Sequence, residues 1–258
     1  MDVSEIPLAR LEERMRSTCS AAALRRLADA LGRDSRAGAR ALGRRCQRRV
    51  AERRRLAGLF RGRARLWRQG LRLVAGVDEV GMGPLAGPVV AAAVVLRDRP
   101  DLPGLDDSKR LSPAARARLA RAIREQALAL AIGSVSPVDI DRWNIYQAGL
   151  EAMRRAVQAL SHVPDHVLVD GREVPRLGVP QTRIVGGDRS DGSIAAASIV
   201  AKVHRDGLMQ GLERRYPGYG FARHKGYATR EHLEALERLG PCPEHRRSFA
   251  PVLQLHFL

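Results

Sequence analysis

Short apolar runs bounded by turn residues organise the chain from residue 71 onward. Residues 71–77 and 88–96 are almost wholly apolar, a pattern typical of buried strands. Only ten residues separate the two runs, too few for the helical crossover that parallel strands need, so the pattern predicts an antiparallel pair. Three further strands are predicted at residues 130–135, 166–170 and 182–185.

Segments with helical spacing alternate with the later strands. Ser112 and Pro113 are the residue types preferred at a helix N-cap and first turn, and they predict a helix that runs to about residue 129. Thr229 is a candidate N-cap for the last predicted helix. The other predicted helices cover residues 145–160, 194–215 and 229–239. This order of elements predicts an α/β domain with a mixed sheet.

The first 70 residues show helical spacing and no strand pattern. They hold 19 arginines against 7 acidic residues, and Gly62 and Gly70 interrupt them. A long basic helix or a helix pair fits this pattern, with a domain boundary between residues 70 and 71. Such a segment is expected to bury little on its own. It would therefore either pack on the domain at residues 71–258 or grip a phosphate backbone.

Charge narrows the class of partner. The 258-residue chain carries a formal net charge of +17, and Arg side chains that contact phosphates release condensed counterions. The charge therefore favours nucleic acid, although 42 arginines against three lysines are also what codon bias produces. Charge does not separate a binding protein from an enzyme.

Composition restricts the cellular context. Apolar residues make up 45% of the chain, enough for a large core, but the longest apolar run is too short to cross a bilayer. Cys19, Cys46 and Cys242 stand far apart, so we expect neither a disulfide framework nor a zinc site. The expected location is the cytoplasm.

Carboxylates follow two of the apolar strands. Asp78 and Glu79 come directly after residues 71–77, and Asp170 ends residues 166–170. Ligands of open α/β sheets bind beyond the carboxyl ends of strands, and oxygen ligands suit Mg²⁺ or Mn²⁺. Neighbouring strand residues point to opposite faces, so a shared site requires the chain to leave the pleat here, which Gly81 and Gly83 permit. Alternatively, the three carboxylates are turn caps or solvated side chains.

Several sequence blocks together resemble the motifs of ribonuclease HII, the type 2 ribonuclease H. The first and most specific block, AGVDEVGMGPLAGPVVAAAV, spans residues 75–94. The others follow in order up to residue 252: DSKRLS at 107–112, LVDG at 168–171, AAASIVAKV at 195–203, HKGYAT at 224–229 and HRRSFAPV at 245–252. The resemblance implies a ribonuclease H-like catalytic domain at residues 71–258 and a metal-dependent endoribonuclease.

The resemblance also implies roles for individual residues. Asp78, Glu79 and Asp170 match the family's metal-binding acids, and Asp188 matches its fourth active-site carboxylate. Four carboxylates with two Mg²⁺ or Mn²⁺ ions suit in-line phosphodiester hydrolysis that leaves 3′-hydroxyl and 5′-phosphate ends. The implied substrates are RNA–DNA hybrids and duplex DNA that carries single ribonucleotides, cut on the 5′ side of the ribonucleotide.

The implied substrate contacts begin with the glycine loop, whose main chain contacts the ribose 2′-hydroxyl in the family. Here the sequence departs from the family, which usually has Arg or Lys at the position of Met82, and Gly186 replaces a frequent Lys. Tyr227 matches the family tyrosine that lies against the sugar. The full set of expected substrate-binding residues is Gly81, Met82, Gly83, Lys109, Ser198, Lys202 and Tyr227.

Other residues near these motifs leave alternatives open. Ser198, Lys202 and Arg205 share one helical face that either meets phosphates or, for Ser198, serves tight packing. The aromatic residues at positions 216, 219, 221 and 227 lie among cations and suit base or sugar contacts, or else pack a turn. His162, His166 and His232 stand in surface-like contexts and receive no role.

The sequence thus predicts a monomeric, metal-dependent endoribonuclease without membrane association. One alternative is a non-catalytic nucleic-acid-binding protein that works through its basic N-terminal segment. Four carboxylates on a phosphate-facing surface argue against it, because without metal they would repel the ligand. A second alternative is a ribonuclease that prefers long hybrids, against which the glycine loop and Tyr227 count.

Overall fold

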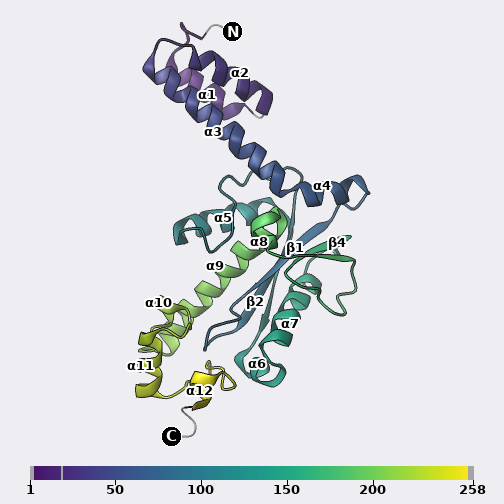
Figure 1. The fold of residues 1–258 in the computed structure, drawn as a ribbon, viewed down its shortest axis with the longest axis vertical. Helices are drawn as coiled ribbons and strands as arrows, with labels where there is room; N and C mark the ends of the chain where they lie inside the picture. The colour runs from purple at the N-terminus through teal and green to yellow at the C-terminus, as the bar shows by residue number, and fades with distance from the viewer. Residues whose placement is uncertain (1–2, 19, 255–258) are drawn as a thin grey trace. The chain divides into compact units, whose positions relative to one another are not determined.

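Four helices precede a five-stranded sheet in the computed structural model, which describes residues 3–18 and 20–254 (Figure 1). The chain divides into two compact units between Leu59 and Phe60. The predicted boundary after residue 70 therefore differs from the division seen here.

The first unit is a small helical bundle with a core of its own. It consists of α1 (Leu8–Ser17), α2 (Ala21–Gly32) and α3 (Ala37–Leu59). Apolar residues at helical spacing, among them Leu11, Leu24, Leu31 and Cys46, are buried together between the helices. The expectation that this segment buries little on its own is wrong, because α2 folds back on α3 and α1 packs beside them.

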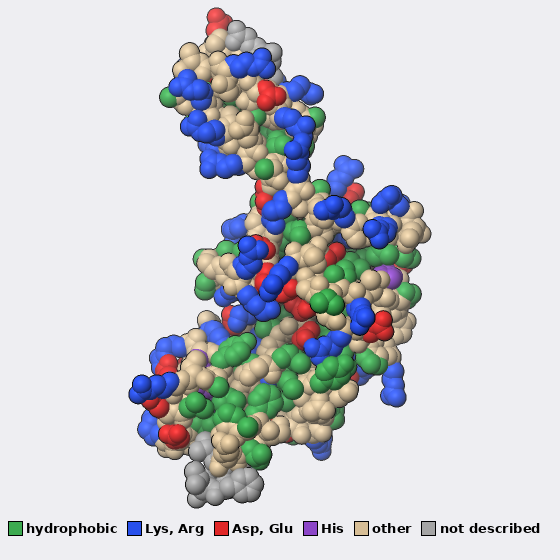
Figure 2. Space-filling view, viewed as in Figure 1, with side chains coloured by type: hydrophobic (Ala, Val, Ile, Leu, Met, Phe, Trp, Pro, Cys, Tyr) green, Lys and Arg blue, Asp and Glu red, His purple; other side chains and the backbone are tan. Residues whose placement is uncertain are grey.

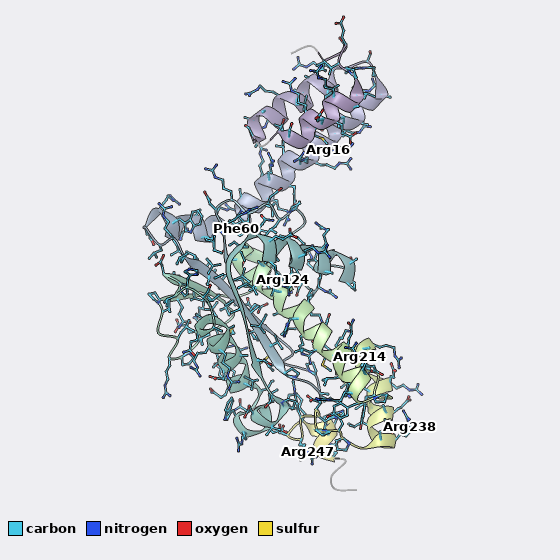
Figure 3. The ribbon with its side chains drawn as sticks, turned by 180° about the vertical axis from the view of Figure 1, so that it is seen from behind. Arg16, Phe60, Arg124, Arg214, Arg238 and Arg247 are labelled. Carbon is cyan, nitrogen blue, oxygen red and sulfur yellow. The ribbon has the colours of Figure 1, made fainter. Side chains whose placement is uncertain are left out.

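Residues 60–70 belong to the second unit. In α4 (Arg61–Arg68), Leu66 and Trp67 pack against an apolar cluster of this unit. The buried guanidinium of Arg63 donates to the carbonyls of Leu96 and Arg97. The ring of Phe60, labelled in Figure 3, fills the space beside Gly192. These contacts explain why the division falls before α4.

The second unit is built on a mixed sheet with the order β3-β2-β1-β4-β5. β2 is antiparallel to β1 and to β3, whereas β4 is parallel to β1 and to β5. The mixed sheet and the antiparallel pair of early strands are therefore confirmed. The strands are β1 (Val74–Val80), β2 (Val89–Leu96), β3 (Ala127–Val135), β4 (His166–Asp170) and β5 (Gln181–Ile184).

One long helix covers each face of the sheet (Figure 1). α7 (Ile145–Gln158) packs on β2 and β3, where a Cβ on Gly133 would stand 2.0 Å from the carbonyl oxygen of Ala152. α9 (Gly192–Arg215) packs on β1 and β2, where a Cβ on Gly76 would stand 2.2 Å from the carbonyl carbon of Ser193. At these two glycines the backbone of the helix therefore meets the strand without a side chain between them.

The remaining helices lie around this framework. Ser112 caps α5 (Pro113–Gln126), as predicted, but the helix ends before residue 129 because β3 starts at Ala127. Thr229 caps α11 (Arg230–Leu239), as predicted. Four short helices were not predicted: α6 (Pro137–Trp143), α8 (Gly187–Ser190), α10 (Phe221–His224) and α12 (Ala250–Gln254). Within the described residues, no helix has the length and apolar character to span a membrane.

Candidate active site

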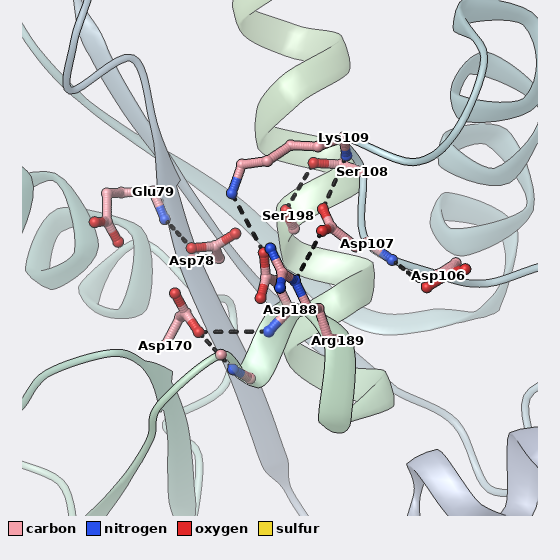
Figure 4. A network of polar contacts seen from close by, with 12 residues as sticks. Asp78, Glu79, Asp106, Asp107, Ser108, Lys109, Asp170, Asp188, Arg189 and Ser198 are labelled. Atoms are coloured by element: carbon pink, nitrogen blue, oxygen red, sulfur yellow. Dashed lines mark hydrogen bonds and ion pairs between the residues drawn. The ribbon is translucent and has the colours of Figure 1, made fainter.

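Asp78 and Glu79 lie on opposite faces of β1 (Figure 4). Both residues stay in register with β2, opposite Ala92 and Ala91, so the expectation that the chain leaves the pleat here is wrong. Asp78 faces α9 and is only 6% exposed. Glu79 faces α7, where its Cγ lies close to Gly149. The two carboxylates therefore approach the carboxyl end of the strand from both sides.

Asp170 joins them because β4 runs parallel to β1. Val77 pairs with Val169, so the next residues along the two strands, Asp78 and Asp170, lie side by side. The Oδ1 atom of Asp170 accepts the main-chain N–H of Gly187 at 2.7 Å. This hydrogen bond holds the first turn of α8 against the end of β4.

Asp188 reaches the site from α8. Its Oδ2 lies 3.4 Å from Nζ of Lys109, whose side chain is 75% exposed, whereas that of Asp188 is 8% exposed. Asp107, buried at 1% exposure, fixes this segment by accepting the Lys109 N–H at 2.9 Å and Nε of Arg189 at 3.1 Å. Sequence reasoning assigned no role to Asp107 or Arg189, although Asp107 opens the DSK block that includes Lys109.

The carboxylates raise one another's pKa values. Burial, with the charges of Glu79 and Asp170, raises the pKa of Asp78 well above its ordinary value. Burial also raises the pKa of Glu79, although Arg172 opposes the shift, and burial with the charge of Asp188 raises the pKa of Asp170. Anions held this closely are unstable without a compensating positive charge.

The donor set fits a hard divalent cation. The Oε2 atom of Glu79 is buried and has no hydrogen-bond partner, which is costly unless a ligand completes it. Every candidate ligand is a carboxylate oxygen, as Mg²⁺ and Mn²⁺ prefer. Across residues 3–18 and 20–254, no three acidic, Cys or His side chains are yet gathered tightly enough to hold an ion.

Of the predicted substrate residues near the carboxylates, some are packed or paired within the protein and one is an exposed cation. Ser198 is 5% exposed and its hydroxyl lies 3.0 Å from that of Ser108, so it is packed into the site wall. Lys202 pairs with Asp206 at 2.8 Å. Arg205 is completely buried and turns away from solvent, so the hypothesis that it faces phosphates is wrong. Lys109 is the exposed cation of this set.

The glycine loop and Tyr227 lie together. A Cβ on Gly83 would stand 3.7 Å from Cε1 of Tyr227, whose side chain is partly open to solvent. Met82 points the other way and packs against α7 at Gly149. The surface at this point therefore consists of main chain and an aromatic ring, without the charge usual at position 82.

Several aromatic residues and histidines near the C-terminal end of α9 lie in the interior. Tyr219 and Phe221 are buried and stack at 5.2 Å, and Tyr216 packs beside their cluster. His232 is completely buried, so its assignment to a surface-like context is wrong. Its Nδ1 lies 2.9 Å from the Tyr227 carbonyl oxygen and its Nε2 lies 3.1 Å from His245. Sequence reasoning missed this pair because the two histidines meet only in the folded chain.

Two of the three cysteines lie in the described part of the chain. Cys46 and Cys242 are buried and unpaired in the described part of the chain, and they lie in the cores of different units. Cys19 lies outside the described residues.

Comparison with known proteins identifies the family. A family model for ribonuclease HII matches residues 75–252. The chain is 56% identical over 206 residues to a ribonuclease HII of Geobacillus thermodenitrificans, covering 80% of this chain and 79% of the relative. It is 55% identical over 231 residues to a ribonuclease HII of Myxococcus xanthus, covering 88% and 79%. The crystal structure of ribonuclease H2 from Pyrococcus horikoshii superposes with a TM-score of 0.63 at 26% identity, covering 71% of this chain and 97% of that one. On these grounds the chain belongs to the ribonuclease HII family of metal-dependent endoribonucleases.

Proposed function

We propose that this chain cleaves the RNA strand of RNA–DNA hybrids and cuts duplex DNA on the 5′ side of single embedded ribonucleotides. The observation that carries the proposal is the meeting of Asp78, Glu79, Asp170 and Asp188 beside an exposed lysine at the end of two parallel strands. A carboxylate group of this kind repels phosphates unless metal is bound, so it suits a nuclease better than a passive nucleic-acid binder.

The four carboxylates would hold two divalent cations. When bound, such a pair readies the attacking water and stabilises the charge on the leaving 3′ oxygen. Asp78, Glu79 and Asp170 would bind directly, and the unpartnered Oε2 of Glu79 would gain a ligand. The products would carry 3′-hydroxyl and 5′-phosphate ends.

Substrate recognition would use the surface next to the carboxylates. Lys109 is placed to meet a phosphate, since its ammonium is exposed and already close to Asp188. The main chain of residues 81–83 would read the ribose 2′-hydroxyl, and Tyr227 would lie against the neighbouring sugar. Ser198 and Lys202, both on α9, would contact the substrate strand. Tyr227 beside Gly83 favours recognition of a single ribonucleotide over a preference for long hybrids.

The N-terminal unit would bind the duplex backbone without sequence preference. The exposed Arg44 and Arg48 follow each other at i,i+4 spacing on α3, an arrangement of like charges that disfavours the isolated helix. Within the described ranges neither forms an ion pair, and Glu12, Asp34 and Glu52 pair with other arginines. Figure 2 shows arginine side chains, in blue, spread over the visible face of this unit. A polyanion is the ligand that such a surface suits.

One cleavage assay tests the proposed activity. End-labelled duplex DNA with one ribonucleotide, an RNA–DNA hybrid and an all-DNA duplex are incubated with Mg²⁺, Mn²⁺ or EDTA. We expect metal-dependent cleavage of the first two substrates only, with the single-ribonucleotide duplex cut on the 5′ side of the ribonucleotide. Cleavage that persists in EDTA would contradict the metal mechanism. Binding without any cleavage would instead favour a non-catalytic nucleic-acid-binding protein.

A further inference from the structure

Two arginines are completely buried beneath the glycine loop. Arg205, on α9, and Arg246, in the segment before α12, are the largest side chains with almost no exposed surface. Arginine is almost never fully buried unless it is paired with an acid. Neither arginine forms an ion pair with an acidic side chain in the described part of the chain. Their burial therefore needs another explanation.

Arg246 is bound by main-chain carbonyls of the loop. Its Nη2 donates to the oxygens of Gly81 at 2.6 Å and Gly87 at 2.8 Å, and its Nη1 donates to the oxygen of Met82 at 3.1 Å. Its Nε also donates to Gly87. The guanidinium thus joins the start and the end of the loop that connects β1 to β2.

Arg205 supports the same loop from α9 and connects it to a second one. It donates to the carbonyl oxygens of Pro88, Ala86 and Lys225, at 3.0, 3.1 and 3.0 Å. Lys225 lies two residues before Tyr227. Gly81 has φ +93°, and a Cβ there would stand 2.3 Å from Nε of Arg205. Glycine at position 81 therefore allows the arginine to approach the main chain.

Both guanidiniums carry their charge in a dry environment. Burial, with the charge of Arg205, lowers the pKa of Arg246 to about 9, so Arg246 remains a cation at neutral pH. Burial likewise lowers the pKa of Arg205. Carbonyl oxygens accept the hydrogen bonds of both guanidiniums, and the carbon of the Arg246 guanidinium lies 5.1 Å from the centre of the Phe249 ring. The loop carbonyls are consequently drawn inward, toward the two arginines.

Peptide planarity then fixes the outer surface of the loop. In a trans peptide the carbonyl of one residue and the N–H of the next point in opposite directions. Because the oxygens of Gly81 and Met82 both point at Arg246, the N–H groups of Met82 and Gly83 point away from it. No acceptor for these two N–H groups is found among the described residues. Two successive free donors on one side suit a hydroxyl or an anionic oxygen.

We infer that Arg246 and Arg205 are positioning residues for substrate recognition, which hold the N–H groups of Met82 and Gly83 toward the ribose and its phosphate. The inference rests on the proposed function, because it assigns the origin of the glycine loop's selectivity. It also explains how the loop keeps a positive field although position 82 carries no charge: the charge lies underneath the main chain. Neither arginine touches the substrate.

The test compares conservative variants with a matched buried arginine. Arg246→Lys and Arg205→Lys keep a cation but cannot bind several carbonyls at once. Arg63→Lys is the control, because Arg63 is also buried on carbonyl oxygens, those of Leu96 and Arg97. Steady-state cleavage is measured at a temperature where each variant is folded, on the one-ribonucleotide duplex and on the hybrid.

We expect KM for the one-ribonucleotide duplex to rise about tenfold in both loop variants. The reason is that the variants weaken a contact that already forms when the substrate binds. The value of kcat should change much less, and the preference for the one-ribonucleotide duplex over the hybrid should fall. Arg63→Lys should lose stability but keep KM and the preference. A loop variant that behaves like Arg63→Lys would overturn the inference.

Two further outcomes are informative. If the unmodified chain cleaves neither substrate, the proposed function fails, whereas the inference fails alone if the unmodified chain cleaves and the loop variants keep its KM. If both loop variants fail to fold while Arg63→Lys folds, the arginines serve only the fold, and the inference is withdrawn.

Discussion

The sulfur of Met82 lies over Gly149 of α7, 2.9 Å from the place where a Cβ on that glycine would stand. Gly149 therefore provides the space that Met82 occupies. Met82 in turn packs against the apolar core between the sheet and α7. The side chain at the centre of the glycine loop is thus a packing residue here.

Gly149→Ala should push Met82 out of its place. Overpacking of this kind costs about 1–3 kcal/mol, and the better helix propensity of alanine offsets roughly 0.5–1 kcal/mol. We expect a net loss of about 1 kcal/mol in the free energy of unfolding, measured in urea. Gly207→Ala on α9 is the control, because a Cβ there meets nothing within 4 Å and should stabilise. Equal effects of the two changes would contradict the contact with Met82.

Met82→Arg should strengthen substrate binding. A guanidinium cannot stay against the apolar core, so it should turn outward toward the substrate phosphates. One exposed phosphate contact, at roughly 1–2 kcal/mol, predicts a gain in kcat/KM of about five- to thirtyfold on the one-ribonucleotide duplex. The gain should lie in binding, and Gly83→Ala should reduce activity whichever residue stands at position 82. An unchanged or lower kcat/KM would show that the loop surface does not meet phosphate.

Asp78→Asn and Asp170→Asn should each reduce cleavage by several orders of magnitude without unfolding the chain. Burial raises the pKa of both carboxyls, so their ionised forms destabilise the fold when metal is absent. The melting temperature in EDTA should therefore stay equal or rise in each variant. The exposed Asp98→Asn is the control, for which cleavage should be unchanged. Near-normal cleavage by either site variant would refute the metal assignment.

The buried histidines should make stability fall in acid. Burial, with the charge of His232, lowers the pKa of His245 to about 4 from its ordinary value of 6.5. The unfolded chain therefore gains its proton first, so stability is lost as pH falls below about 6.5 and continues to fall toward pH 4. For His245 alone the loss between pH 7.5 and pH 5 is about 2 kcal/mol.

Urea unfolding at the two pH values measures this loss. His245→Gln should reduce the pH dependence by about that amount, whereas the exposed His162→Gln should leave it unchanged. His245 faces His232, the carbonyl oxygen of Cys242 and the rings of Tyr219 and Phe221, so no buried acid compensates its proton. A variant with the full pH dependence would place its origin elsewhere.

Two truncations separate binding from folding at the N-terminus. Removal of residues 1–59 should keep the second unit folded but weaken duplex binding and flatten its salt dependence, by about 0.9 in log–log slope per lost phosphate contact. Removal of residues 1–70 also deletes Arg63 and Trp67, so it should lower the melting temperature as well. An unchanged slope after the first truncation would show that the N-terminal unit does not touch nucleic acid.

The sequence pattern predicted those parts of the fold that depend on residues close together in the chain. β4 and the caps of α5 and α11 agree with prediction because a strand ending in a carboxylate and a Ser or Thr cap are visible within a few residues. β1 instead extends to Val80, because pairing with β2 continues beyond its apolar run. Strand ends depend on the partner strand, which the local pattern does not contain.

The candidate site divides in the same manner. The carboxylates were predictable because their positions follow strand ends and a specific motif. The burial of Arg205 and His232 was not, since both residues neighbour charged positions in sequence. Distant segments take part in enclosing them, residues 86–88 for Arg205 and His245 for His232. The core of the N-terminal unit also depends on helices that meet only after the chain has folded back.

Gly76 determines how closely α9 packs on β1 near the site. Contact between Gly76 and Ser193 fixes where α9 rests on β1. Asp78 lies two residues after Gly76, about 7 Å along the strand, and Ser198 lies five residues after Ser193, about 7.5 Å along the helix. The two side chains are therefore at nearly the same distance from the contact. A side chain at position 76 would push α9 away from β1 and increase the distance between Asp78 and Ser198. Gly76 therefore sets the distance between β1, which carries Asp78, and α9, which carries Ser198. Gly76 itself takes no part in the chemistry.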